Sequence, residues 1–119
     1  MKNSLLLVIL FLAFAGTTQT GSIRGVVKDE STSASVPFTM ASIHKMDGSP
    51  IAFIQANIDG IYSFSNLAEG KYILKFNTTQ HSETVLTGVQ VLNGKMTMQT
   101  AYLNTLLLNL YDLSYSNNQ

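Results

Sequence analysis

Hydrophobic and polar residues alternate along most of the chain after residue 20. The clearest case is 71–77, where Tyr72, Leu74 and Phe76 share one face and Lys71, Ile73, Lys75 and Asn77 share the other. Alternation with a period of two is typical of a strand that buries one face. Turn residues interrupt the pattern about every 8–12 positions, as in a sandwich or barrel of short strands.

This pattern predicts an all-β domain, which we expect to be a seven-stranded antiparallel Greek-key β-sandwich. The expected strands cover residues 22–28, 38–45, 51–56, 61–64, 71–77, 85–92 and 95–103. Their alternation places several apolar side chains toward the core, among them Ala41, Ile43, Tyr62, Phe64, Tyr72, Leu74, Phe76, Val89 and Val91. The pattern leaves Phe38 and Phe53 unassigned, and it predicts exposure for Tyr102 and Tyr111.

Short runs of turn-forming residues separate the expected strands. Asn57 and Asp59 have side chains that bond nearby backbone groups, and Gly60 accepts a positive φ at little cost. Gly70 is expected in the next turn. Asn93 and Gly94 form the dipeptide that most favours a two-residue hairpin, so we expect it to join two paired strands. A calcium loop is not supported at residue 57, since the twelfth position of such a loop is Ala68 here rather than a glutamate.

The first residues have the layout of a signal peptide. Lys2 is followed by an apolar run from Leu5 to Ala15, and small residues stand at Ala13 and Ala15. That run is shorter than the roughly 20 residues a bilayer-spanning helix needs. We therefore predict a signal peptide over 1–15, cleavage near Ala15 to Thr20, a sandwich domain over 21–104 and a tail over 105–119. The mature chain would then carry no transmembrane span and act in the periplasm, at the outer membrane or outside the cell.

Charge and residue types exclude several function classes. The chain has seven basic and seven acidic residues, so loss of Lys2 with the signal peptide leaves a net charge of −1 and no electrostatic basis for nucleic-acid binding. The chain has no cysteine, which excludes disulfides and thiolate chemistry. His44 and His81 lack partners at metal-ligand spacing, and we expect both on the solvated surface. We expect no catalytic residues, metal or cofactor.

An ordered series of motifs resembles the carboxypeptidase regulatory-like domain. It consists of Ile23-x-Gly25-x-Val27-x-Asp29, Pro37, Ala41-x-Ile43, Asn57-x-Asp59-Gly60-x-Tyr62-x-Phe64 and Leu67-x-x-Gly70-x-Tyr72-x-Leu74. The resemblance covers roughly Ser22 to Leu103 and implies a transthyretin-like sandwich of the carbohydrate-binding-like group. In that family the domain is usually an accessory, for example at the N-terminus of TonB-dependent outer-membrane receptors. Ala56, where the family often has threonine, departs from the pattern.

These observations favour an exported, non-catalytic accessory or interaction module of the bacterial cell envelope. The leucine-rich tail supplies a candidate contact for an envelope protein, through Leu106, Leu107, Leu108, Leu110 and Leu113. One alternative is a carbohydrate-binding module, which requires aromatic rings exposed in a shallow strip to contact a glycan. Another is the N-terminal fragment of a TonB-dependent receptor.

Overall fold

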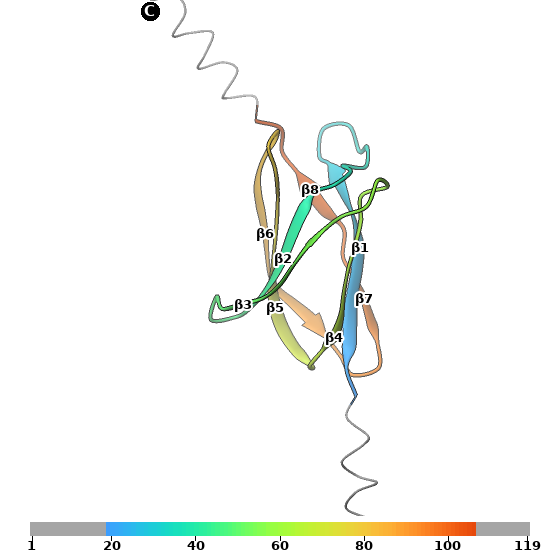
Figure 1. Ribbon diagram of the computed structural model, residues 1–119, viewed down its shortest axis with the longest axis vertical. Coiled ribbons are helices and arrows are strands. Elements are labelled where there is room, and N and C mark those ends of the chain that lie inside the picture. The colour runs from blue at the N-terminus through green and yellow to red at the C-terminus, as the bar shows by residue number, and fades with distance from the viewer. Residues whose placement is uncertain (1–18, 107–119) are drawn as a thin grey trace, which may run out of the picture.

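The computed structural model describes residues 19–106, and these form an all-β domain of two sheets. The predicted signal peptide and the residues from Leu107 onward, which include Tyr111, lie outside the described part. Within 19–106 no helix is present that could cross a membrane. Figure 1 shows that β1 starts at one end of the domain and that β8 ends at the other, so the described chain enters and leaves at opposite ends.

The first sheet is built around β1 (Gly21–Asp29). The strand β4 (Ile61–Leu67) pairs with it antiparallel on one side. On its other side lie β7 (Met96–Met98) and β8 (Ala101–Leu103), both parallel to β1. These two short strands follow one another along the same edge, with Gln99 and Thr100 between them.

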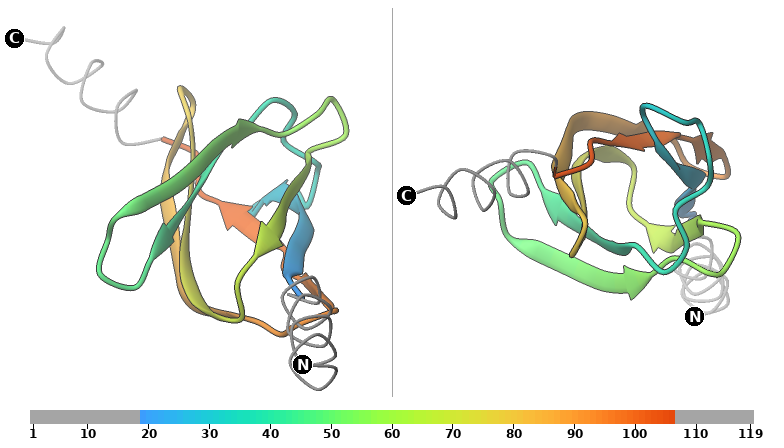
Figure 2. Two further views of the ribbon diagram at one scale, coloured as in Figure 1. Left: turned by 60° about the horizontal axis from the view of Figure 1, so that its bottom comes forward. Right: turned by 90° about the horizontal axis from the view of Figure 1, so that it is seen from above.

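The second sheet is antiparallel and has the order β3-β2-β5-β6. Its strands are β2 (Met40–Lys45), β3 (Pro50–Gln55), β5 (Gly70–Thr78) and β6 (His81–Val91). The two sheets face each other (Figure 2), and buried apolar side chains from both form one core. They are joined on one side where β6 meets the end of β8: the Ser82 N–H donates to the Asn104 carbonyl at 2.9 Å, and His81 forms a bridge with Thr105.

The core confirms the inward faces that the alternation predicts. All nine apolar side chains expected inside are buried, and Ile23, Val27, Leu67, Ala101 and Leu103 are buried with them. The Tyr62 and Phe76 rings pack edge to face with centroids 4.9 Å apart. The Tyr62 hydroxyl donates to the Gln99 carbonyl at 2.5 Å, and burial raises the pKa of Tyr62 well above its usual value.

The expected all-antiparallel pairing is wrong for the last strands, because β7 and β8 run parallel to β1. The chain turns at Asn93 and Gly94, where Gly94 has a φ of +73° and the Lys95 N–H donates to the Leu92 carbonyl. This turn carries the chain from β6 to the other sheet and does not close a hairpin. A turn motif fixes only local geometry, whereas the strand partner depends on which sheet edge is free.

Two strand boundaries also differ from the prediction. The polar stretch between the expected strands 71–77 and 85–92 is mostly strand, since Thr78 pairs with His81 across a tight turn. Thr79, Gln80, Ser82 and Glu83 are exposed, and His81 bonds to Thr78 and Asp29, so the polarity of these residues does not prevent pairing. The second strand begins at Met40 and not at Phe38, because Phe38 has a φ of +59°, which a strand residue does not adopt.

Candidate functional site

The outer face of the second sheet presents side chains from all four of its strands. Ser42 on β2 lies opposite Phe53 on β3 and opposite Lys75 on β5, and Lys75 in turn lies opposite Val85 on β6. These four residues therefore form one row across the sheet. Residues in register on one face of a sheet have their side chains in mutual reach.

A shallow groove of about 330 Å³ opens on this face. Ser42 and His44 line it and are only 9% and 8% exposed, whereas Phe53 is 68% exposed. The Phe53 ring stands edge to face with the His44 ring, with centroids 6.1 Å apart and an angle of 88° between the planes. The groove thus combines a buried polar pair with an exposed aromatic side chain.

Only one of the two ring nitrogens of His44 has a hydrogen-bond partner. Its Nε2 lies 2.8 Å from the Ser42 hydroxyl, but its Nδ1 is buried without a hydrogen-bond partner. The prediction that His44 is a solvated surface residue is therefore wrong, since its neighbours on the sheet cover the ring. A buried polar atom without a partner costs free energy.

Groups that form hydrogen bonds complete the lining of the groove. Lys75 provides a cation, Glu83 an anion and Asn77 an amide. Neither Lys75 nor Glu83 is in an ion pair with another residue of the described chain, where the one ion pair joins His81 to Asp29. The two opposite charges leave the groove without a net charge, so it favours neither a strongly anionic nor a strongly cationic ligand.

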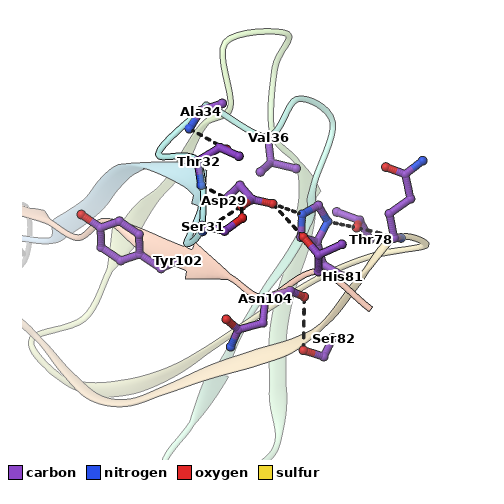
Figure 3. A network of polar contacts seen from close by, with 12 residues as sticks. Asp29, Ser31, Thr32, Ala34, Val36, Thr78, His81, Ser82, Tyr102 and Asn104 are labelled. Atoms are coloured by element: carbon purple, nitrogen blue, oxygen red, sulfur yellow. Dashed lines mark hydrogen bonds and ion pairs between the residues drawn. The ribbon is translucent and has the colours of Figure 1, made fainter. Parts of the chain in front are cut away.

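A second polar cluster joins three distant segments around Asp29 (Figure 3). Asp29 Oδ2 lies 2.9 Å from His81 Nε2 and accepts a hydrogen bond of 3.0 Å from the Thr105 hydroxyl, while Oδ1 accepts one of 2.6 Å from the Ser31 hydroxyl. Hydrogen bonds from Ser31, then His81 and Thr105, hold the pKa of the Asp29 carboxyl well below its usual value. The side chain of His81 is 9% exposed, so the expectation of a solvated surface is wrong here as well.

The same cluster places a hydroxyl, an imidazole and a carboxylate in series, as in a hydrolase triad. The Thr78 hydroxyl lies 2.7 Å from His81 Nδ1. However, that hydroxyl also accepts the Gln80 N–H at 3.1 Å, and so it closes the turn between β5 and β6. We therefore assign the cluster a structural role, in which it fixes the chain at Thr105 to the ends of β1 and β6.

The predicted turn residues lie in separate turns and do not come together. Asn57 Oδ1 accepts the N–H groups of Asp59 and Ile61, each at 2.9 Å, and Gly60 has a φ of +76°. Of the tail leucines the structure describes only Leu106, whose N–H donates to the Gln80 carbonyl at 2.9 Å. The other four lie outside the described residues. Between residues 19 and 106 no cluster of His, Asp or Glu side chains is arranged to hold a metal ion.

Sequence reasoning did not find the groove. Alternation placed Ser42 and His44 away from the core, but it did not show that neighbouring side chains bury them. The sequence does not assign Phe53 to the core or to the surface. The expected exposure of Tyr102 is confirmed, since that side chain is 49% exposed.

The fold of the described chain is a β-sandwich, and solved structures with a similar fold include two bacterial pilins. It is similar to the minor pilin of Streptococcus agalactiae, with a TM-score of 0.59 and 15% identity over 74% of this chain and 45% of the pilin. It is similar also to the major pilin of Bacillus cereus, with a TM-score of 0.56, 14% identity and coverage of 73% and 30%.

A third similar structure is a "putative carbohydrate binding protein" of Bacteroides uniformis. Its TM-score is 0.57, with 15% identity over 69% of this chain and 40% of that protein. This chain therefore spans less than half the length of each of the three proteins. No family model and no curated protein sequence matches it. At these identities the similarity establishes the fold, and function has to be argued from the site.

Proposed function

We propose that this chain is a non-catalytic carbohydrate-binding module of the cell envelope that binds its glycan in the groove beside Phe53. The observation that carries the proposal is the exposed phenylalanine ring next to the buried Ser42–His44 pair, in which one imidazole nitrogen lacks a partner. Ligand sites typically combine an apolar surface with a few polar groups that fix orientation.

The chemistry of a sugar ring matches both parts of the groove. Its C–H bonds form an apolar face that packs on an aromatic ring, while its hydroxyl groups both donate and accept hydrogen bonds. Phe53 offers the ring, and the Asn77 amide and the Glu83 carboxylate offer partners for the hydroxyls. Because the two charges of the groove oppose each other, a neutral sugar fits better than a phosphate or an ammonium group.

Two further observations support this function. The groove lies on the outer face of a sandwich whose fold is shared with the Bacteroides uniformis protein described as a carbohydrate binder. The signal peptide predicted over residues 1–15 would place the domain outside the cytoplasm, where polysaccharides occur. That the chain is the N-terminal part of a TonB-dependent receptor remains a prediction from the sequence resemblance.

Retention of the full chain on immobilised neutral polysaccharides tests the proposal, with the Phe53→Ala variant beside the wild type. Loss of the ring removes stacking worth about 1 kcal/mol or more, and we expect affinity to fall about fivefold or more. Ile58→Ala is the matched control, because Ile58 is 70% exposed in the turn before β4 and does not line the groove. Equal retention of the wild type and Phe53→Ala would contradict the proposed site.

The end of the described chain favours a second candidate function, the docking of an envelope protein on the tail. Leu106 is held at the end of the sandwich through Gln80, and the sequence that follows continues with Leu107, Leu108, Leu110 and Leu113. A chain that ends at Leu106 keeps the contact between Thr105 and Asp29 and removes the other leucines. If this shortened chain keeps every envelope partner of the full chain, the tail is not the contact.

A further inference from the structure

The groove beside Phe53 continues into a second depression of about 380 Å³. Met40 and Asn77 line both of them, so the two depressions adjoin along β2 and β5. The second one extends past the start of β2 toward the turn between β5 and β6, where Thr79 and Gln80 line it. Together they form one elongated groove with a half at Phe53 and a half at Phe38.

The half at Phe38 also has an exposed aromatic side chain. Phe38 is 53% exposed and has a φ of +59°, a conformation that bulky residues rarely adopt. Backbone strain of this kind persists only where the surroundings impose it, and it is concentrated at functional sites. The positive φ of Phe38 therefore marks this residue as a candidate for function, independently of the groove beside Phe53.

The contacts that impose this conformation are well defined. The Phe38 N–H donates to the Asn57 carbonyl at 3.2 Å, and the Gln55 amide donates to the Phe38 carbonyl at 3.3 Å. The next residue, Thr39, is fully buried, and its hydroxyl donates to the Val36 carbonyl at 3.1 Å. Burial of Thr39 and the bonds on both sides of Phe38 hold the backbone while the ring stays at the surface.

The polar lining of this half is neutral. Gln55, Asn77 and Gln80 contribute amides and Thr79 a hydroxyl, and no Lys, Arg, Asp or Glu lines it. His81 also lines it, but both of its ring nitrogens are already bonded, to Thr78 and Asp29. The second half therefore shares an exposed phenylalanine and amide groups with the first, but it lacks the charged side chains that Lys75 and Glu83 bring to the first half.

We propose that the ligand is a linear neutral oligosaccharide that occupies both halves, with one sugar ring against Phe53 and another against Phe38. This inference rests on the proposed function and adds the length of the ligand. Phe38 precedes Ser42, the register partner of Phe53, by four residues, which span at most about 14 Å of extended chain. A short oligosaccharide is long enough to extend from one depression into the other and so to contact both phenylalanines.

The affinity for neutral oligosaccharides of increasing length tests the inference. The full chain is titrated calorimetrically with gluco-, manno-, galacto- and xylo-oligosaccharides, each from the monosaccharide to the hexamer. We expect affinity for the recognised series to rise at least tenfold between the monosaccharide and the hexamer, because the longer ligand adds the contacts of the second half. Equal affinity for the monosaccharide and the hexamer would overturn this inference and leave the proposed function intact. Binding of no series would contradict the proposed function itself.

Variants of Phe38 separate stacking from folding. Phe38→Leu keeps an apolar side chain without the ring, and Phe38→Gly also relieves the positive φ, so that at least the glycine variant folds. We expect both variants to lose about tenfold in affinity for the hexamer and to bind the monosaccharide as the wild type does. Ile58→Ala again serves as the exposed control. Hexamer binding at wild-type strength by both variants would overturn the inference.

Discussion

Replacement of Gly25 by alanine tests how the last strands are held against β1. A Cβ atom at this position would lie 1.7 Å from the Gln99 carbonyl oxygen and 2.9 Å from the Tyr62 hydroxyl, whereas real Cβ contacts are not shorter than 3.0 Å. The segment between β7 and β8 must therefore move by at least 1.3 Å, the difference between 3.0 and 1.7 Å. Such a shift breaks or weakens two hydrogen bonds of Gln99. Its N–H donates to the Arg24 carbonyl, and its carbonyl accepts a hydrogen bond from the Tyr62 hydroxyl.

The expected loss follows from these contacts. Each of the two hydrogen bonds contributes about 0.5–1.5 kcal/mol, and overpacking costs about 1–3 kcal/mol, so the free energy of unfolding should fall by about 2–6 kcal/mol. For a domain of this size that lowers the melting temperature by roughly 10 °C or more. Urea and thermal unfolding of the full chain, followed by circular dichroism, measure the change. Ser63→Ala is the control, because Ser63 is exposed on the neighbouring strand and its loss should change stability by less than about 0.5 kcal/mol. A Gly25→Ala loss below about 1 kcal/mol would refute the steric reasoning.

Three further changes test the core and the polar cluster. Tyr62→Phe removes the donor to Gln99 and should cost about 1–3 kcal/mol in chemical unfolding; an unchanged midpoint would show that this bond contributes little. Leu74→Ala opens a cavity at a fully buried position and should cost about 2–5 kcal/mol by the same measurement, with a loss under 1 kcal/mol as the contrary result. Because the folded pKa of Asp29 lies below the usual 3.8, its ionised form stabilises the fold above about pH 4, and this contribution is lost as pH falls further. In unfolding curves across pH, Asp29→Asn should therefore be less stable than the wild type above pH 4, and the gap should narrow below it; a gap independent of pH would contradict this.

The sequence predicted which side chains lie in the core, but it did not predict the groove. Inward residues such as Tyr72, Leu74 and Phe76 repeat with period two because one face of each strand excludes water, and that repeat is visible along the chain. The groove depends on side chains that meet only across strands. Ser42, Phe53 and Lys75 come from three strands, and their proximity follows from the pairing of β2 with β3 and β5. No spacing along the chain encodes that register.

Phe38 illustrates the same limit within a single segment. Its residue type favours a strand, and the sequence placed it at the start of one. Bonds to Asn57 and Gln55, together with the burial of Thr39, instead hold it at a positive φ. Tertiary contacts here overrode a local preference, as is usual at strained positions.

The sequence by itself determined that this chain forms a small all-β domain with an apolar face on each main strand. Burial of one face of a strand makes apolar and polar residues alternate with a period of two, and this alternation is visible within a few residues of sequence. The absence of cysteine from the sequence also excludes thiol chemistry. The tertiary structure decided that β7 and β8 run parallel to β1, that His44 and His81 are enclosed, and that Phe38 and Phe53 border one groove. Those features arise from contacts between residues far apart in the chain, and their free energies depend on distances that only the folded state defines.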